Sequence, residues 1–159
     1  MSRVQLALNV DNLEEAVTFY SKLFNVQPAK RKPGYANFAV AEPPLKLVLI
    51  ENPGQGGSLN HLGVEVETSE TVHQEIARLS AEGLFTDEEI GTTCCFAKQD
   101  KVWVAGPAGE RWEVYTVLED SDTFGTSPQQ PGADGESVCC GNAEADETGE
   151  KVSSSAACC

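Results

Sequence analysis

Two cysteines, Cys94 and Cys95, are neighbours in the sequence, and adjacent thiols can bind one soft, thiophilic atom together. Neighbouring Cα atoms lie about 3.8 Å apart, whereas a disulfide usually needs roughly 4.4–6.8 Å. A disulfide between the two would therefore be strained and easily reduced. The pair predicts a clamp for a soft metal or metalloid. The alternative is that both are small apolar residues packed on a strand.

All six cysteines of the chain occur as such neighbours, and the other two pairs are Cys139-Cys140 and Cys158-Cys159. A secreted disulfide framework normally separates its cysteines along the chain. The first residues resemble a strand rather than a signal peptide, and no apolar stretch approaches the eighteen or so residues of a membrane span. We therefore expect a soluble, cytoplasmic protein whose thiols stay reduced.

Composition divides the chain into two unlike parts. The 159 residues are 40% hydrophobic, enough for one domain with a core. The formal charge of −14 argues against binding to nucleic acid or to an anionic membrane, because both need basic patches. From Glu119 onward, nine acidic residues face one basic residue, Lys151, and bulky apolar residues are almost absent. Such a composition predicts a disordered acidic tail over residues 119–159.

The folded part contains an internal repeat. Residues 5–11 align with residues 61–67 at an offset of 56, and both segments alternate like half-buried strands. A helix is predicted after each, capped by Asn12 in the first case and by Ser69 in the second, where Gly83 ends it. Three further strands are expected in each half, at 27–30, 35–41 and 45–51, and at 84–91, 101–105 and 111–118. The sequence therefore predicts an α+β domain over residues 1–118, built from two βαβββ modules, 1–52 and 58–118.

Three motifs occur in order on this duplicated frame: residues 10–16 with Phe19-Tyr20, residues 61–64, and residues 106–115. Together they resemble the vicinal-oxygen-chelate superfamily, which includes glyoxalase I, extradiol dioxygenases and bleomycin-resistance proteins. The resemblance implies that the two modules curl into a cupped, open-barrel sheet. It also implies metal ligands on the first strand of each module and on the last strand of the second, which are Gln5, His61 and Glu113 here.

Each of these ligands has an ordinary alternative. Gln5 could simply face solvent on its strand, whereas Glu113, between Trp112 and Val114, needs a partner such as a cation if it points inward. His73 is expected on the exposed side of its helix and outside the site. One histidine, one carboxylate and one further ligand resemble the facial triad of ferrous oxygenases, although Gln5 stands where many iron-using relatives have histidine.

The stretch 92–103, with Cys94-Cys95 in an expected loop before a strand, resembles the carbon–arsenic lyases often labelled cadmium-induced proteins. That resemblance implies a non-haem Fe(II) dioxygenase that uses O2 to cleave the C–As bond of trivalent organoarsenicals, such as methylarsenite or trivalent aromatic arsenicals, and releases inorganic arsenite. Cys94 and Cys95 would hold the arsenic, and their loop could close over the metal like a lid.

Two other functions stay open. A glyoxalase-like, metal-dependent isomerase would use the same three ligands, but glyoxalase I adds a second carboxylate from the last strand of its first module. Here that strand has no acid before Glu51. A non-enzymatic protein could instead sequester Cd(II) or As(III) with its thiols. The tail pairs either collect arsenical or have no role, and the chain is expected to be a monomer or a homodimer.

Overall fold

The computed structural model describes residues 2–125, which form one eight-stranded sheet and two helices. Its strand order is β2-β3-β4-β1-β5-β8-β7-β6, so the first strands of the two halves, β1 and β5, meet at its centre. The predicted α+β fold, with a βαβββ order that occurs twice, is confirmed. The elements are β1 (Arg3–Val10), α1 (Leu13–Phe24), β2 (Lys30–Lys32), β3 (Tyr35–Val40), β4 (Leu45–Glu51), β5 (Leu59–Glu65), α2 (Ser69–Ala81), β6 (Asp87–Cys94), β7 (Ala97–Ala105) and β8 (Arg111–Asp120).

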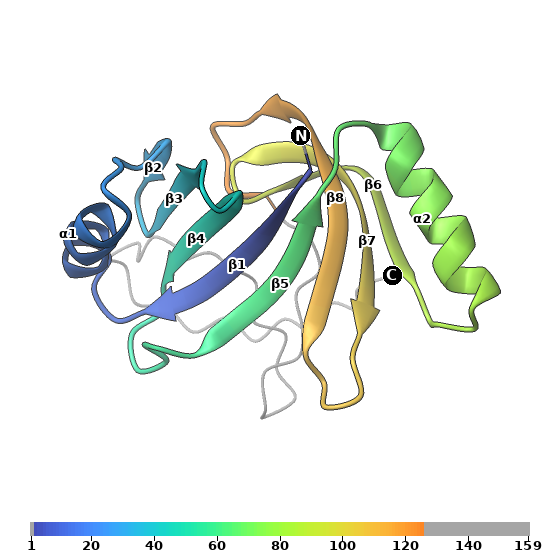
Figure 1. Cartoon of the computed structure of the whole chain (residues 1–159), viewed down its shortest axis with the longest axis horizontal. Coiled ribbons are helices and arrows are strands. Elements are labelled where there is room, and N and C mark those ends of the chain that lie inside the picture. Colours follow the sequence, from blue (N-terminus) through green and yellow to red (C-terminus); the bar gives the residue numbers. More distant parts are fainter. Residues whose placement is uncertain (1, 126–159) are drawn as a thin grey trace, which may run out of the picture.

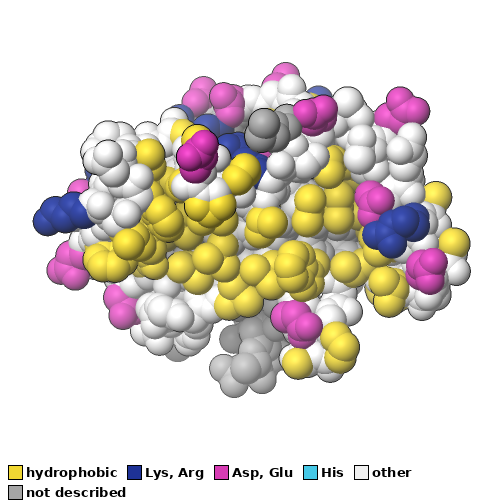
Figure 2. Space-filling view, in the orientation of Figure 1, with side chains coloured by type: hydrophobic (Ala, Val, Ile, Leu, Met, Phe, Trp, Pro, Cys, Tyr) yellow, Lys and Arg dark blue, Asp and Glu magenta, His cyan; other side chains and the backbone are white. Residues whose placement is uncertain are grey.

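The two halves are joined in a symmetric way. Strand β1 pairs antiparallel with β5, while β1 pairs parallel with β4 and β5 pairs parallel with β8. The sheet curls strongly, with α1 packed beside β3 and β4 at one end and α2 beside β7 and β8 at the other (Figure 1). Apolar side chains gather across the sheet between the helices on the face that Figure 2 shows.

The helices begin at side-chain caps and bury one apolar stripe each. Asn12 caps α1 as predicted, because its side chain accepts a hydrogen bond from Glu15 N at 3.1 Å. The cap of α2 is Thr68 rather than the predicted Ser69, since Thr68 Oγ1 accepts from Thr71 N at 3.2 Å and Ser69 is already helical. Two apolar clusters result, one under α1 around Val17 and Phe38 and one under α2 around Val72 and Val102.

The strands of the second half differ most from expectation. Strand β6 ends at Cys94 and β7 begins at Ala97, so Cys95 and Phe96 form a two-residue hairpin turn rather than a long loop. Both have positive φ, 54° and 62°, as a type I′ turn requires. Such turns normally carry Asn or Gly, which explains why this one was not recognised. The loop expected at the thiol pair is therefore a tight hairpin turn, and its closure over the metal stays a prediction.

The tip of this hairpin contacts the opposite end of the sheet. Lys30 Nζ of β2 donates to the Phe96 carbonyl at 3.0 Å, and the Phe96 ring lies 5.5 Å from that of Tyr35 in β3. Phe124 packs against both rings, with centroids 5.3 and 6.5 Å away. These contacts bring the two edges of the curled sheet together.

Residues beyond the predicted end of the domain take part in this closure. Strand β8 continues to Asp120, and Gly125 forms an isolated bridge with Cys94. The last strand is thus two residues longer than the predicted strand 111–118, because Glu119 and Asp120 still pair with β7. The four tail cysteines, from Cys139 to Cys159, lie outside the described residues. Neither described helix is long and apolar enough to cross a membrane.

Candidate metal and thiol site

The inner face of the central strands carries polar side chains that are nearly inaccessible to solvent. Gln5 of β1, His61 of β5 and Glu113 of β8 are 4%, 6% and 3% exposed. Gln5 pairs with Gly63, and Gly63 pairs in turn with Glu113, so the register places the two side chains on either side of the same residue of β5. The three residues that the sequence singled out as ligands are brought together here, while His73 is exposed on α2.

The three side chains meet through one atom each. Gln5 Nε2 lies 3.0 Å from His61 Nε2 and 2.6 Å from Glu113 Oε1, and His61 Nε2 lies 3.3 Å from the same carboxylate oxygen. An octahedral cation with bonds of about 2.1 Å holds adjacent ligand atoms about 3 Å apart. The spacing therefore fits one triangular face of such a cation. Within residues 2–125 no three His, Cys, Asp or Glu side chains form a metal cluster, so the amide of Gln5 has to complete the set.

Gly63 creates the space in which these side chains meet. A Cβ atom at this position would lie 3.0 Å from Glu113 Cγ and 3.3 Å from Gln5 Cβ. Both distances are shorter than ordinary van der Waals contact, so any larger residue would push the ligands apart. The resemblance drew attention to Gly63 only as part of a motif, and its role depends on the pairing of three strands.

The orientation of the His61 ring follows from a chain of hydrogen bonds. Its Nδ1 lies 2.7 Å from Asn60 Oδ1, Asn60 Nδ2 donates to Asn9 Oδ1, and Asn9 Nδ2 donates to Ser58 Oγ. Ser58 Oγ in turn donates to the backbone carbonyl of Gln55 at 2.6 Å. Because that carbonyl can only accept, every donor in the chain is determined, and Nδ1 of His61 carries the proton. The lone pair of Nε2 is left to face Gln5 and Glu113, as a metal ligand requires.

Lys101 of β7 is the buried cation of the site, and we did not identify it from the sequence. Its ammonium is 1% exposed and lies 3.2 Å from Glu113 Oε2. Burial alone would raise the pKa of Glu113, but the positive charge of Lys101 outweighs burial and lowers that pKa to about 2. The pKa of Lys101 is raised despite burial, chiefly because of Glu113 and the two thiols. The sequence does not distinguish Lys101 from Lys98, because both lie in the polar first part of β7 and only burial in the fold separates them.

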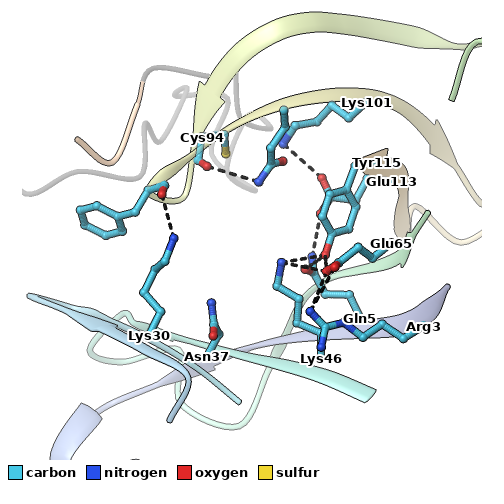
Figure 3. A network of polar contacts seen from close by, with 12 residues as sticks. Arg3, Gln5, Lys30, Asn37, Lys46, Glu65, Cys94, Lys101, Glu113 and Tyr115 are labelled. Carbon is cyan, nitrogen blue, oxygen red and sulfur yellow. Dashed lines mark hydrogen bonds and ion pairs between the residues drawn. The ribbon is translucent and has the colours of Figure 1, made fainter. Parts of the chain in front are cut away.

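The positive charge of Lys101 also acts to lower the pKa of both thiols. Cys94 Sγ and Cys95 Sγ are 3.2 Å apart. The hydrogen bond from Cys95, with help from the Lys101 charge, lowers the pKa of Cys94 to about 7 against the effect of burial. The pKa of Cys95 is raised, because it donates that hydrogen bond and its sulfur is partly removed from solvent. Figure 3 shows Cys94, Lys101, Glu113 and Gln5 arranged around the same interior region from different strands.

Comparison with known proteins identifies the family. The family model described as "Glyoxalase/Bleomycin resistance protein/Dioxygenase superfamily" matches residues 3–114. The chain belongs to this superfamily. The predicted resemblance is thereby confirmed.

Two relatives within the glyoxalase/dioxygenase superfamily are similar over most of their length. The chain is 54% identical over 160 residues to the "Trivalent organoarsenical cleaving enzyme" of Thermomonospora curvata, covering 100% of both proteins. It is 75% identical over 142 residues to the "Cadmium-induced protein CadI" of Mycobacterium tuberculosis, covering 88% of this chain and 93% of that protein. The name of the Thermomonospora relative supports an enzyme of the superfamily.

A solved dioxygenase shares the fold. The 2,3-dioxygenase LapB from Pseudomonas sp. KL28 matches with a TM-score of 0.57 and 22% identity, over 79% of this chain and 43% of that chain. At this level of identity the likeness concerns the superfamily fold alone.

Proposed function

We propose that this superfamily member is a non-haem Fe(II)-dependent dioxygenase that cleaves the carbon–arsenic bond of trivalent organoarsenicals, such as methylarsenite and trivalent aromatic arsenicals, and releases inorganic arsenite. The observation that carries the proposal is the pairing of two unlike half-sites. A three-ligand set of Gln5, His61 and Glu113 and a pair of adjacent thiols are linked by one buried ammonium, that of Lys101. The organoarsenical-cleaving name of the Thermomonospora relative supports the substrate class.

The thiol pair matches the valence of the substrate. A trivalent arsenic with one organic group has two exchangeable oxygen substituents, which two thiols can replace while the carbon remains bonded. Cys94, whose pKa is about 7, supplies a thiolate for the first substitution. Cys95 lies with its sulfur 3.2 Å away and supplies the second. The organic group then remains the third substituent on a captured arsenic.

The three-ligand set suits a ferrous ion. Fe(II) held there supplies the redox chemistry that O2-dependent cleavage of the C–As bond needs. This chain's own residues prepare the site: Asn60 orients the His61 ring, and Lys101 keeps Glu113 ionised. Such a triad leaves coordination positions open for the reactants.

The glyoxalase-like alternative receives no support from the first module. Glu51, the acid at the end of β4, is exposed and accepts a hydrogen bond from Leu13 N at 2.9 Å. Glu51 therefore accepts a hydrogen bond from the first backbone N–H group of α1. The β4 residue that corresponds to Glu113 is Val48, because Ala7 pairs with Val48 as its repeat equivalent Gly63 pairs with Glu113. An apolar residue thus stands where the isomerase would need a carboxylate.

The test is O2 uptake during turnover of methylarsenite by protein loaded with Fe(II), beside metal-free and anaerobic controls. We expect O2 consumption and arsenite release only when Fe(II), O2 and substrate are all present. Stoichiometric arsenical binding without O2 consumption would instead favour sequestration. Anaerobic activity on a hemithioacetal would favour the isomerase. All proposed site residues come from one chain, so a monomer suffices, and light scattering would distinguish it from a homodimer.

A further inference from the structure

The far end of the Gln5 amide enters a second buried network. Gln5 Oε1 accepts a hydrogen bond from the Tyr115 hydroxyl at 2.5 Å. The same hydroxyl lies 2.9 Å from Glu65 Oε2 and 2.9 Å from Lys46 Nζ. Tyr115 is fully buried on β8, two residues after Glu113. Figure 3 shows Tyr115, Glu65 and Lys46 beside Gln5 and Glu113.

A bound cation would need the Gln5 amide group in a different orientation from the one in this structure. In the structure Nε2 faces His61 and Glu113, and Oε1 faces Tyr115. An amide nitrogen carries two protons and acts as a donor, whereas the amide oxygen has the lone pairs that a metal binds. Gln5 must therefore turn its oxygen toward His61 and Glu113 to become a ligand, which turns its NH2 group toward Tyr115.

Tyr115 can satisfy either orientation because a phenol both donates and accepts. When Oε1 of Gln5 faces it, the hydroxyl proton goes to Gln5. When Nε2 faces it, the phenol oxygen accepts from Gln5 and the proton turns to Glu65 Oε2, which already lies at 2.9 Å. Lys46 donates to the phenol oxygen in both arrangements.

Glu65 is arranged to receive that proton. Arg3 Nη2 lies 3.0 and 3.2 Å from its two carboxylate oxygens, and Lys46 Nζ lies 3.1 Å from Oε2. Two cations thus hold this acceptor in place next to the phenol. Without such an acceptor, a phenol facing the Gln5 NH2 group would have no partner for its own proton in this buried network.

We propose that Tyr115 is a positioning residue that, together with Glu65, lets Gln5 turn its amide oxygen toward the metal. The proposal rests on the proposed metal site and adds residues to which the sequence reading gave no role. It makes metal binding depend on a side chain that does not touch the metal. Partners of this kind that orient metal ligands typically contribute 10–100-fold to metal affinity.

The test is the affinity of the full-length Tyr115→Phe variant for Co(II) and Fe(II), measured by competition with a chromophoric chelator. We expect a dissociation constant about 10–100-fold above that of the parent, because the turned amide would bury an NH2 group without an acceptor. The matched control is Tyr35→Phe, which removes another buried phenol whose hydroxyl contacts Asn37, and it should keep the parent affinity. Glu65→Gln, which weakens the acceptor and keeps its volume, should give a smaller loss in the same direction.

Repeating the measurement in a Gln5→His variant distinguishes an effect on the orientation of the Gln5 amide from a general loss of structure. Histidine at position 5 binds through a ring nitrogen and has no amide to turn, so Tyr115→Phe should have little effect on affinity in a Gln5→His background. An equal loss in both backgrounds, or a parent-like affinity of both Tyr115→Phe and Glu65→Gln, would overturn the positioning role and leave the proposed function intact. A parent protein that binds neither metal would overturn the proposed function as well.

Discussion

The ammonium of Lys101 lies 3.2 Å from Oε2 of Glu113, while Oε1 of the same carboxylate faces Gln5 and His61. One oxygen of the carboxylate thus faces the permanent positive charge of Lys101, and the other oxygen faces the two remaining ligand residues. Because both partners are buried, removing either one leaves an uncompensated charge. The charge of Lys101 also acts on Cys94, so a single side chain influences both halves of the site.

Replacing Lys101 should destabilise the protein in a way that a metal ion can reverse. In Lys101→Met the Glu113 carboxylate is left unpaired, and we expect the metal-free free energy of unfolding to fall by about 3–5 kcal/mol. A divalent cation would supply the missing positive charge, so added Co(II) should raise the melting temperature more in this variant than in the parent. The measurement is thermal and urea unfolding with and without Co(II).

Lys98→Met provides the control for that experiment on the same strand. Lys98 is 44% exposed and pairs with Glu119 at 3.4 Å, so its loss should cost about 0–1 kcal/mol. Equal destabilisation by the two substitutions would contradict the importance given to the buried pair.

The reactivity of Cys94 should depend on pH with a midpoint near 7. Its pKa is about 7 instead of the usual 9.0, and only the thiolate reacts, so the rate of alkylation by iodoacetamide should rise as pH increases through about 7. Peptide mass spectrometry can follow Cys94 separately from the tail cysteines. In Lys101→Met the midpoint should move upward, because a cation that favours the thiolate is gone. A midpoint near 9 in the parent would contradict the assignment.

The double substitution Cys94→Ser/Cys95→Ser should abolish turnover of methylarsenite and leave metal binding intact. Serine keeps the size of the side chains but is a hard oxygen ligand with little affinity for arsenic. Arsenite release and Co(II) affinity are measured on the same preparation. Turnover at the parent rate would show that the pair is not the substrate clamp.

Enlarging Gly63 should weaken the metal site. In Gly63→Ala the new methyl group would lie 3.0 Å from Glu113 Cγ, so the carboxylate has to shift. We expect at least about a tenfold loss of metal affinity, and overpacking should reduce stability by about 1–3 kcal/mol. Chelator competition measures the first effect, and unfolding of the metal-free protein measures the second. An unchanged affinity would mean that the ligands adjust freely.

Part of this architecture is visible in the sequence because its signals are local. The repeat at an offset of 56, the cap at Asn12 and the alternation along residues 5–11 and 61–67 predicted both modules. The cap at Thr68 and the turn at Cys95-Phe96 were missed, because neighbouring residues offer competing choices and a positive φ at Phe96 goes against local preference.

Some residues of the site could likewise be identified from the sequence, and others only from the structure. The resemblance singled out Gln5, His61 and Glu113, since those residue types stand at recognisable positions in a motif. The thiol pair was visible from the adjacency of its two cysteines. The partners Lys101, Asn60 and Tyr115 came only from the folded chain.

By itself, the sequence determined a duplicated α+β domain and an unusual thiol pair, and its resemblance to the superfamily implied three metal ligands. Only the tertiary structure decided that the three meet through atoms 2.6 to 3.3 Å apart, that Gly63 leaves the room for them, and that Lys101 links them to Cys94. The physical reason is that these relations depend on the register of β1, β5 and β8 and on burial. Both arise from pairing between segments fifty or more residues apart, which no local pattern records.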